Sequence, residues 1–119
     1  MPSRSDPDRR LRDIRDNIVL AKEFIAGLTY EAFLANTLVF YGVTRCLEII
    51  SEASRRLPQE LKARHPEIPW TDMAGAGNVY RHDYEDVQHR LVWGTVHNRL
   101  AALLAAVERE LQNGGEPVE

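Results

Sequence analysis

The sequence has few of the residues on which disulfide or metal-bound frameworks depend. Cys46 is its only cysteine, which excludes a disulfide framework. His65, His89 and His97 are too dispersed for a ligand set, and no cysteine or histidine spacing indicates zinc. We therefore expect neither a bound metal nor a cofactor.

Two further absences narrow the class of protein. No apolar run reaches transmembrane length and no signal peptide is evident, so we expect no membrane contact and a cytoplasmic location. The formal net charge is −3, whereas a protein that binds nucleic acid non-specifically carries an excess of positive charge. Any contact with RNA must therefore be local.

The pattern of apolar residues predicts helices throughout. The 119 residues suffice for one domain, 1–119, that buries roughly two thirds of its unfolded surface. Apolar residues recur at steps of three and four, and no alternating strand pattern occurs. The pattern predicts helices over about 8–26, 30–57, 57–66, 70–82 and 88–112, and a frayed tail over about 113–119. We therefore predict an all-α fold, an up-and-down helical bundle of four to five helices.

The groups best suited to chemistry lie at the end of the predicted 70–82 helix. His82 can move protons near neutral pH, and Arg81 directly before it can hold a phosphate through its planar fork of donors. Together they indicate chemistry on a phosphodiester, whose cleavage needs a base, an acid and a cation, and the chain offers one suitable histidine. A two-fold dimer would supply a second His82 across the same groove. The alternative is that His82 only caps its helix.

Other polar residues could support this site. Arg45, on the predicted central helix, could be a second cation, and Glu52, one turn from Glu48, could orient Arg45 or His82. An acidic pair flanked by arginines is, however, also typical of a solvated, salt-bridged face. Asn78, one turn before His82, could form a hydrogen bond with its ring or serve only in packing. Both alternatives stay open.

Nearly the whole chain carries short motifs in a fixed order, namely Leu47–Ala53, Leu57-Pro58, His65–Trp70, Met73–Gly75, Asn78, His82–Tyr84 and Val92-Trp93. In order and spacing they resemble the HepT-like branch of the HEPN superfamily. The resemblance implies a small all-helical toxin, generally a homodimer, encoded beside a minimal nucleotidyltransferase antitoxin of the MntA kind. It further implies a metal-independent ribonuclease with an Arg-x4–6-His motif, whose histidine is His82. The antitoxin would silence it by adenylylating the tyrosine two residues later, Tyr84.

The chain departs from this motif at the arginine. Counted back from His82, the positions that the motif allows are 75–77, two glycines and an alanine without an anion-binding side chain. Arg81 is the nearest replacement. Adjacent residues on a helix point about 100° apart, so Arg81 could serve only if the helix has ended there. A subgroup of the family has the same Gly-Asn-Val-x-Arg-His pattern. Arg90-x6-His97 also fits the motif, but without the surrounding family residues, and we interpret it as coincidence.

Tyr84 can lie beside His82 only where the chain is not helical. On a helix, residues two apart point about 200° apart, whereas on an extended chain they share a side. Acidic residues at 83, 85 and 86 favour a loop. We therefore predict an irregular exit that projects Tyr84 into the groove of His82. The alternative is that Tyr84 packs its ring on the bundle.

Two functions from different classes follow. The first is an endoribonuclease toxin that uses His82 and Arg81 in a dimer and is neutralised at Tyr84 by the cognate nucleotidyltransferase antitoxin. The second is a catalytically inactive binding module that dimerises and associates with that nucleotidyltransferase. RNA cleavage that is lost in His82→Ala would separate them.

Overall fold

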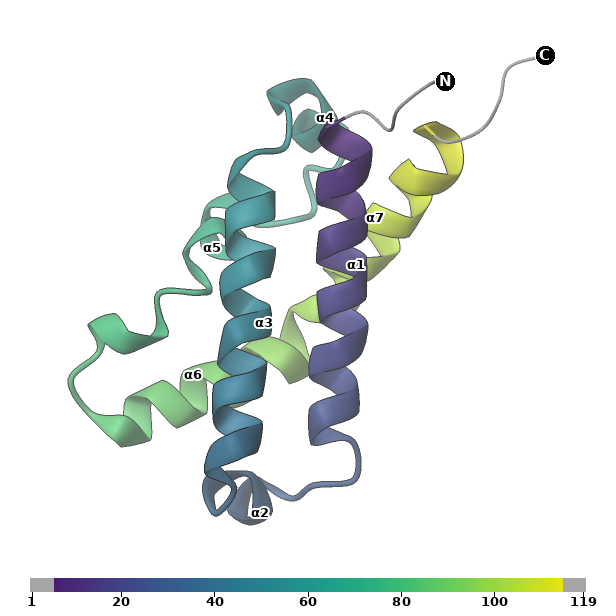
Figure 1. The fold of residues 1–119 in the computed structure, drawn as a ribbon. Helices are drawn as coiled ribbons and strands as arrows, with labels where there is room; N and C mark the ends of the chain where they lie inside the picture. The colour runs from purple at the N-terminus through teal and green to yellow at the C-terminus, as the bar shows by residue number, and fades with distance from the viewer. Residues whose placement is uncertain (1–5, 115–119) are drawn as a thin grey trace.

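The computed structural model describes residues 6–114, which form seven α-helices, one 3₁₀ turn and no strand (Figure 1). The elements are, in order, α1 (Asp6–Ile25), α2 (Tyr30–Leu34), α3 (Thr37–Arg55), α4 (Gln59–Ala63), α5 (Trp70–Gly75), the 3₁₀ turn η1 (Val79–Arg81), α6 (Glu85–Asn98) and α7 (Leu100–Gly114). The predicted all-helical class is confirmed. Within the described range, no helix is both long and apolar enough to span a membrane.

Two long antiparallel helices, α1 and α3, form the body of the molecule (Figure 1). Helix α7 packs along α1, and the short α5 packs against α3. Helix α6 contacts both long helices as well as α7 and η1. The segment from α5 to the start of α6 therefore projects from the α3 side of the body, and this segment contains the predicted site.

Each long helix buries one apolar stripe. On α1 the buried residues, three or four apart, are Leu11, Ile14, Ile18, Ala21 and Ile25. Burial of one such large aliphatic side chain stabilises the fold by roughly 1.5–3 kcal/mol. Helix α1 ends just before Gly27, whose φ of 78° lies in the left-handed region that glycine adopts without steric cost. The predicted end of the first helix near residue 26 is confirmed.

A cluster of aromatic rings fixes α6 against α2 and α3. The ring centroids of Phe33 and Trp93 are 5.1 Å apart, and those of Phe40 and His89 are 4.2 Å apart in a stacked arrangement. The Nδ1 atom of buried His89 lies 2.8 Å from the carbonyl oxygen of Glu85, one turn earlier on α6. His89 is therefore a packing residue, and its cluster holds α6 in the position from which it faces the site.

The predicted helices continue through three points at which the structure breaks them. The first break precedes α3, where Asn36 Oδ1 accepts the N–H of Val39 at 3.1 Å and so caps a new helix. The second follows Gly75, after which the chain forms the separate turn η1. The third is at Arg99, whose φ and ψ of −120° and −32° separate α6 from α7. The described residues consequently hold more and shorter helices than the predicted four to five.

The boundaries of the last segment also differ from the prediction. Helix α6 begins at Glu85 rather than near 88, and α7 continues through Gly114 rather than ending near 112. Of the predicted frayed tail, residues 113 and 114 are therefore helical. Residues 115–119 lie outside the described residues.

Candidate active site

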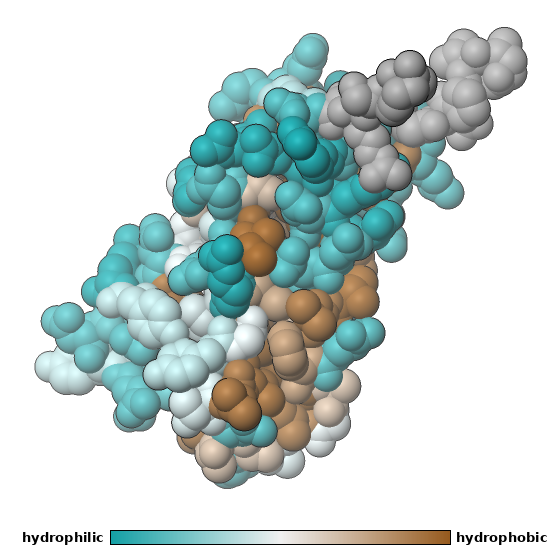
Figure 2. Space-filling view, viewed as in Figure 1, coloured by the Kyte–Doolittle hydropathy of each residue, from teal (hydrophilic) through white to brown (hydrophobic). Residues whose placement is uncertain are grey.

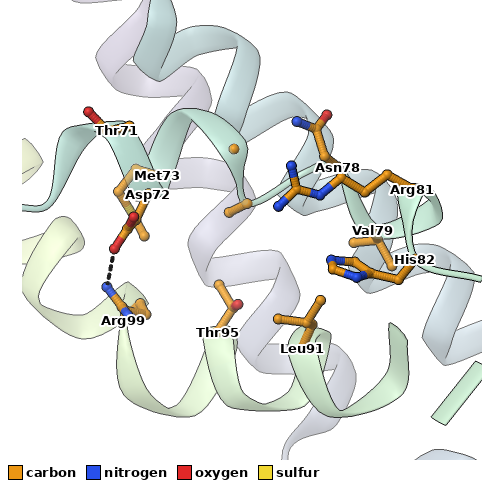
Figure 3. A pocket seen from close by; sticks show the side chains of 12 residues that line it. Thr71, Asp72, Met73, Asn78, Val79, Arg81, His82, Leu91, Thr95 and Arg99 are labelled. Carbon is orange, nitrogen blue, oxygen red and sulfur yellow. Dashed lines mark hydrogen bonds and ion pairs between the residues drawn. The ribbon is translucent and has the colours of Figure 1, made fainter. Parts of the chain in front are cut away.

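An open hollow of about 520 Å³ lies between α5, η1 and α6 (Figure 3). Its polar lining comes from all three elements and the residues beside them, and comprises Thr71, Asp72, Asn78, Arg81, His82, Thr95 and Arg99. Three residues predicted for the site, Asn78, Arg81 and His82, are thus brought together. The hollow is the part of the structure in which the predicted chemistry has to occur.

His82 is held by its backbone, while its ring is left open. Buried Val79 anchors η1 in the core, and the N–H of His82 donates to the Val79 carbonyl at 3.4 Å. Gln88 Nε2 donates to the carbonyl oxygen of His82 at 2.6 Å. Among residues 6–114, no hydrogen bond engages the half-buried imidazole itself. Both ring nitrogens are therefore available to exchange protons with a substrate.

Arg81 shares the hollow because the chain leaves helical geometry at this point. Residues 79–81 form a single 3₁₀ turn, and His82 follows with an extended φ and ψ of −90° and 130°. The guanidinium of Arg81 and the ring of His82 reach into the same end of the hollow (Figure 3). The condition under which Arg81 could replace the motif arginine, an interrupted helix, is therefore met.

Gly77 explains why the motif arginine cannot occupy the position five residues before His82. A Cβ atom added at Gly77 would lie 2.8 Å from the Cα of Glu48 and 3.1 Å from the carbonyl oxygen of Leu47. The Gly77 N–H also donates to Ser51 Oγ at 2.6 Å, which fixes this close approach to α3. No side chain fits between α3 and the chain here. At Gly75, in contrast, an added Cβ meets open space.

Arg45 and Glu52 lie at a different hollow, which α3 forms with α1. Arg45 pairs with Glu48 at 3.1 Å, and Glu52 accepts hydrogen bonds from Arg55 at 2.7 Å and Arg56 at 2.6 Å. The hydrogen bonds from Arg55 and Arg56 lower the pKa of the Glu52 carboxyl. Within one chain, the structure therefore does not bring either residue to His82.

Tyr84 is exposed beside the hollow rather than inside it. It precedes α6 with an extended φ and ψ of −94° and 127°, so the predicted irregular exit from the helix is confirmed. Its side chain is not part of the lining, and the residue is 75% exposed. The predicted projection of Tyr84 into the groove is thus corrected, and so is the alternative of a ring packed on the bundle. Tyr80 does pack, on Phe40, and burial raises the pKa of its phenol.

Two residues of the hollow escaped sequence reasoning, Asp72 and Arg99. Arg99 Nη1 lies 3.1 Å from Asp72 Oδ2 and links the end of α6 to α5 across the hollow (Figure 3). Leu91, Thr95 and Arg99 follow one another at four-residue steps, and this spacing is the signal that could have placed Arg99 on the face of Leu91. Asp72 carries no comparable signal, because its partner is 27 residues away. Asn78 forms no side-chain hydrogen bond with His82 in the described part of the chain.

The fold and the hollow together define the class of protein: over residues 6–114 it is all-helical, with one histidine and two arginines lining a single hollow. A family model described as "Ribonuclease HepT-like" matches residues 14–110. The chain therefore belongs to the HepT-like family of HEPN-type ribonucleases.

Relatives from archaea agree with this assignment. The chain is 38% identical over 99 residues to the "Probable ribonuclease HepT" of Thermococcus cleftensis, covering 83% of this chain and 90% of that one. It is 32% identical over 106 residues to the "Putative RNase MJ1380" of Methanocaldococcus jannaschii, covering 89% and 97%. No solved structure matches this chain significantly. Both of these relatives are named as ribonucleases.

Proposed function

We propose that the protein is a metal-independent endoribonuclease in which His82 transfers protons and Arg81 holds the scissile phosphate. The observation that carries this proposal is that both side chains line one open hollow. Arg81 enters it from the 3₁₀ turn, while position 77, one of the three that the motif allows for its arginine, leaves no room for a side chain. In this proposal the cation of the site is Arg81, the residue directly before the histidine.

The chemistry follows from these two groups. Neutral His82 accepts the proton of a ribose 2′-hydroxyl, and the 2′-oxygen forms a bond to phosphorus as the bond to the 5′-oxygen breaks. The departing 5′-oxygen takes a proton from an imidazolium, and the products are a 2′,3′-cyclic phosphate and a 5′-hydroxyl. Arg81 stabilises the charge that builds on the phosphate oxygens in between.

A homodimer would supply the second imidazole. An exposed apolar area suited to an interface lies over α1 and α3 and comprises Leu20, Phe24, Leu38 and Tyr41. Figure 2 shows hydrophobic side chains gathered there. Leu38 is 82% exposed and Tyr41 57%, although large apolar side chains of monomers seldom gather on the surface without a function. We propose that two chains pair on this area, which lies toward the same end of the body as the site.

The regulation that we propose acts at Tyr84. A nucleotidyltransferase antitoxin would transfer AMP to its hydroxyl, which is accessible because the residue is 75% exposed. The added phosphate would lie two residues from His82 and carry a negative charge that Arg81 can pair with. Under this proposal the protein is the toxin of a toxin–antitoxin pair, and the adenylylated form is the neutralised one. Mass spectrometry after incubation with ATP and the cognate nucleotidyltransferase should find adenylylation on Tyr84, absent from Tyr84→Phe.

The ribonuclease proposal is tested with labelled RNA and the purified protein. Wild type should cleave, EDTA should leave the rate unchanged, and His82→Ala should lower the rate by roughly 10²–10⁴ without altering the melting temperature. Inhibition by EDTA would show that the metal-free mechanism is wrong. Undiminished cleavage by His82→Ala would place catalysis elsewhere.

The closed position at Gly77 favours a second function, a catalytically inactive module that dimerises and associates with a nucleotidyltransferase. In that case wild type would not cleave RNA but would still co-elute with the nucleotidyltransferase in size-exclusion chromatography. Cleavage by wild type, abolished in His82→Ala, excludes this alternative.

A further inference from the structure

We infer that Arg99 is a second phosphate-binding residue of the hollow. In the free protein it pairs with Asp72, and single-stranded RNA displaces this carboxylate when it binds. This inference rests on the proposed ribonuclease function, and it adds a subsite that lies away from the reacting phosphate. Arg99 lines the same hollow as Arg81 and His82. It lies at the C-terminal end of α6, whereas Arg81 and His82 precede the N-terminal end of that helix.

The geometry separates this subsite from the catalytic pair. In Figure 3 the ring of His82 lies over Leu91, whereas Arg99 lies at the far end, beyond Thr95. From Leu91 to Arg99 the helix rises by about 12 Å, at 1.5 Å per residue. An RNA strand laid along the hollow with one phosphate at His82 would therefore present a neighbouring phosphate, and not the same one, to Arg99.

The Asp72–Arg99 ion pair is built so that it can be exchanged. Its N–O distance is 3.1 Å, and the two side chains are 60% and 46% exposed, so water screens the attraction and the pair itself contributes little to stability. Arginine, in contrast, binds phosphate oxygens with two parallel hydrogen bonds. Breaking the ion pair therefore costs little free energy, and Arg99 can then bind a phosphate of the substrate.

The two members of the pair therefore have opposite effects on RNA binding. Arg99→Ala removes a phosphate ligand, and we expect about tenfold weaker binding and a salt dependence whose slope is smaller by about 0.7. Asp72→Ala releases Arg99, and we expect binding about threefold tighter. If the pair only braced α5 against α6, both variants would break the same contact and change binding in the same direction.

The experiment measures binding of a labelled, single-stranded 2′-O-methyl RNA, which cannot be cleaved through its 2′-oxygen, to the full chain by fluorescence anisotropy. Arg90→Ala is the matched control, because Arg90 is also exposed on α6 but does not line the hollow. It should change affinity less than twofold. In the double variant Asp72→Ala/Arg99→Ala, the gain from Asp72→Ala should vanish, because it depends on Arg99.

Three results would overturn the inference: equal losses in Arg99→Ala and Arg90→Ala, weaker binding in both single variants, or a gain from Asp72→Ala that persists without Arg99. Failure to bind this RNA at all would do the same. The ribonuclease proposal is judged separately by cleavage of unmodified RNA in wild type and His82→Ala, so either proposal can fail without the other. Melting temperatures establish that each variant is folded.

Discussion

His65 and His82 show two opposite uses of an imidazole in one small chain. His65 is only 4% exposed, and its Nε2 lies 2.6 Å from Glu110 Oε2, while Arg64 donates to the same carboxylate at 3.0 and 2.9 Å. His82 is half-buried, with an open ring and a fixed backbone. Burial and a carboxylate partner make the first ring part of the fold. A held backbone and an open hollow leave the second ring for chemistry.

The largest effect that would sharpen this comparison is expected from Glu110→Gln. The change removes the charge that half-exposed Arg64 and buried His65 contact, and the loss of this charged acceptor should lower the free energy of unfolding by roughly 2–3 kcal/mol. Urea unfolding at neutral pH measures the loss. His82→Ala, the matched change at the open histidine, should change the free energy of unfolding by less than about 0.5 kcal/mol. Equal losses in the two variants would remove the distinction.

The pH dependence of the same variant gives an independent check. The hydrogen bond from Arg64 lowers the pKa of the Glu110 carboxyl, so the folded state binds this proton less readily than the unfolded chain. The resulting stabilisation is present above the ordinary glutamate pKa of about 4.3 and is lost as the pH falls through the lower, folded value. The difference between wild type and Glu110→Gln should therefore shrink as the pH falls below about 4. A difference that grows would contradict this sign.

A smaller effect is expected where the chain contacts α3 before the site. Gly77→Ala should lower the free energy of unfolding by about 2 kcal/mol, because its Cβ would lie 2.8 Å from the backbone of Glu48. Gly75→Ala, where the added atom meets open space, should be neutral or should stabilise the protein by up to about 1 kcal/mol. Thermal unfolding of the two variants measures both. Equal stability of the two would show that position 77 is not closed.

The smallest effect concerns the contact that holds His82. Gln88→Ala removes the hydrogen bond of 2.6 Å to the His82 carbonyl, and the loss of one neutral hydrogen bond of about 1 kcal/mol should lower kcat about fivefold. Gln112→Ala, on an exposed position of α7, is the control and should leave kcat unchanged. A Gln88→Ala enzyme with full activity would show that η1 alone positions the ring.

The parts of this comparison that could be predicted are those that depend on local pattern. The stripe on α1 repeats at helical spacing, so the helix and its buried face follow from the sequence. The neighbours Arg81 and His82 stand out chemically, and both line the hollow. The breaks at Asn36 and Arg99 were missed because apolar residues continue at helical spacing on both sides of each. Tertiary packing, rather than the pattern, decides where such a segment bends.

Contacts between distant segments could not be predicted. Asp72 and Arg99 meet only because the C-terminal end of α6 comes near α5, and Gly77 is closed only because α3 passes within contact distance. The sequence groups Arg45 and Glu52 with His82 because they are charged residues on the predicted central helix. In the structure these two residues lie on the face of α3 that borders α1, and not on the face that borders the site.

The hydroxyl of Ser51 links α3 to the segment that leads to the site. It accepts the N–H of Gly77 at 2.6 Å and donates to the carbonyl of Met73 at 3.0 Å, so a side chain from α3 terminates α5. A helix of six residues is not stable in isolation. During folding, we therefore expect α5 to become helical only after α3 has packed. For the same reason we expect this segment to unfold locally more readily than the long helices, so that the hollow can be lost while α1, α3 and α7 stay folded.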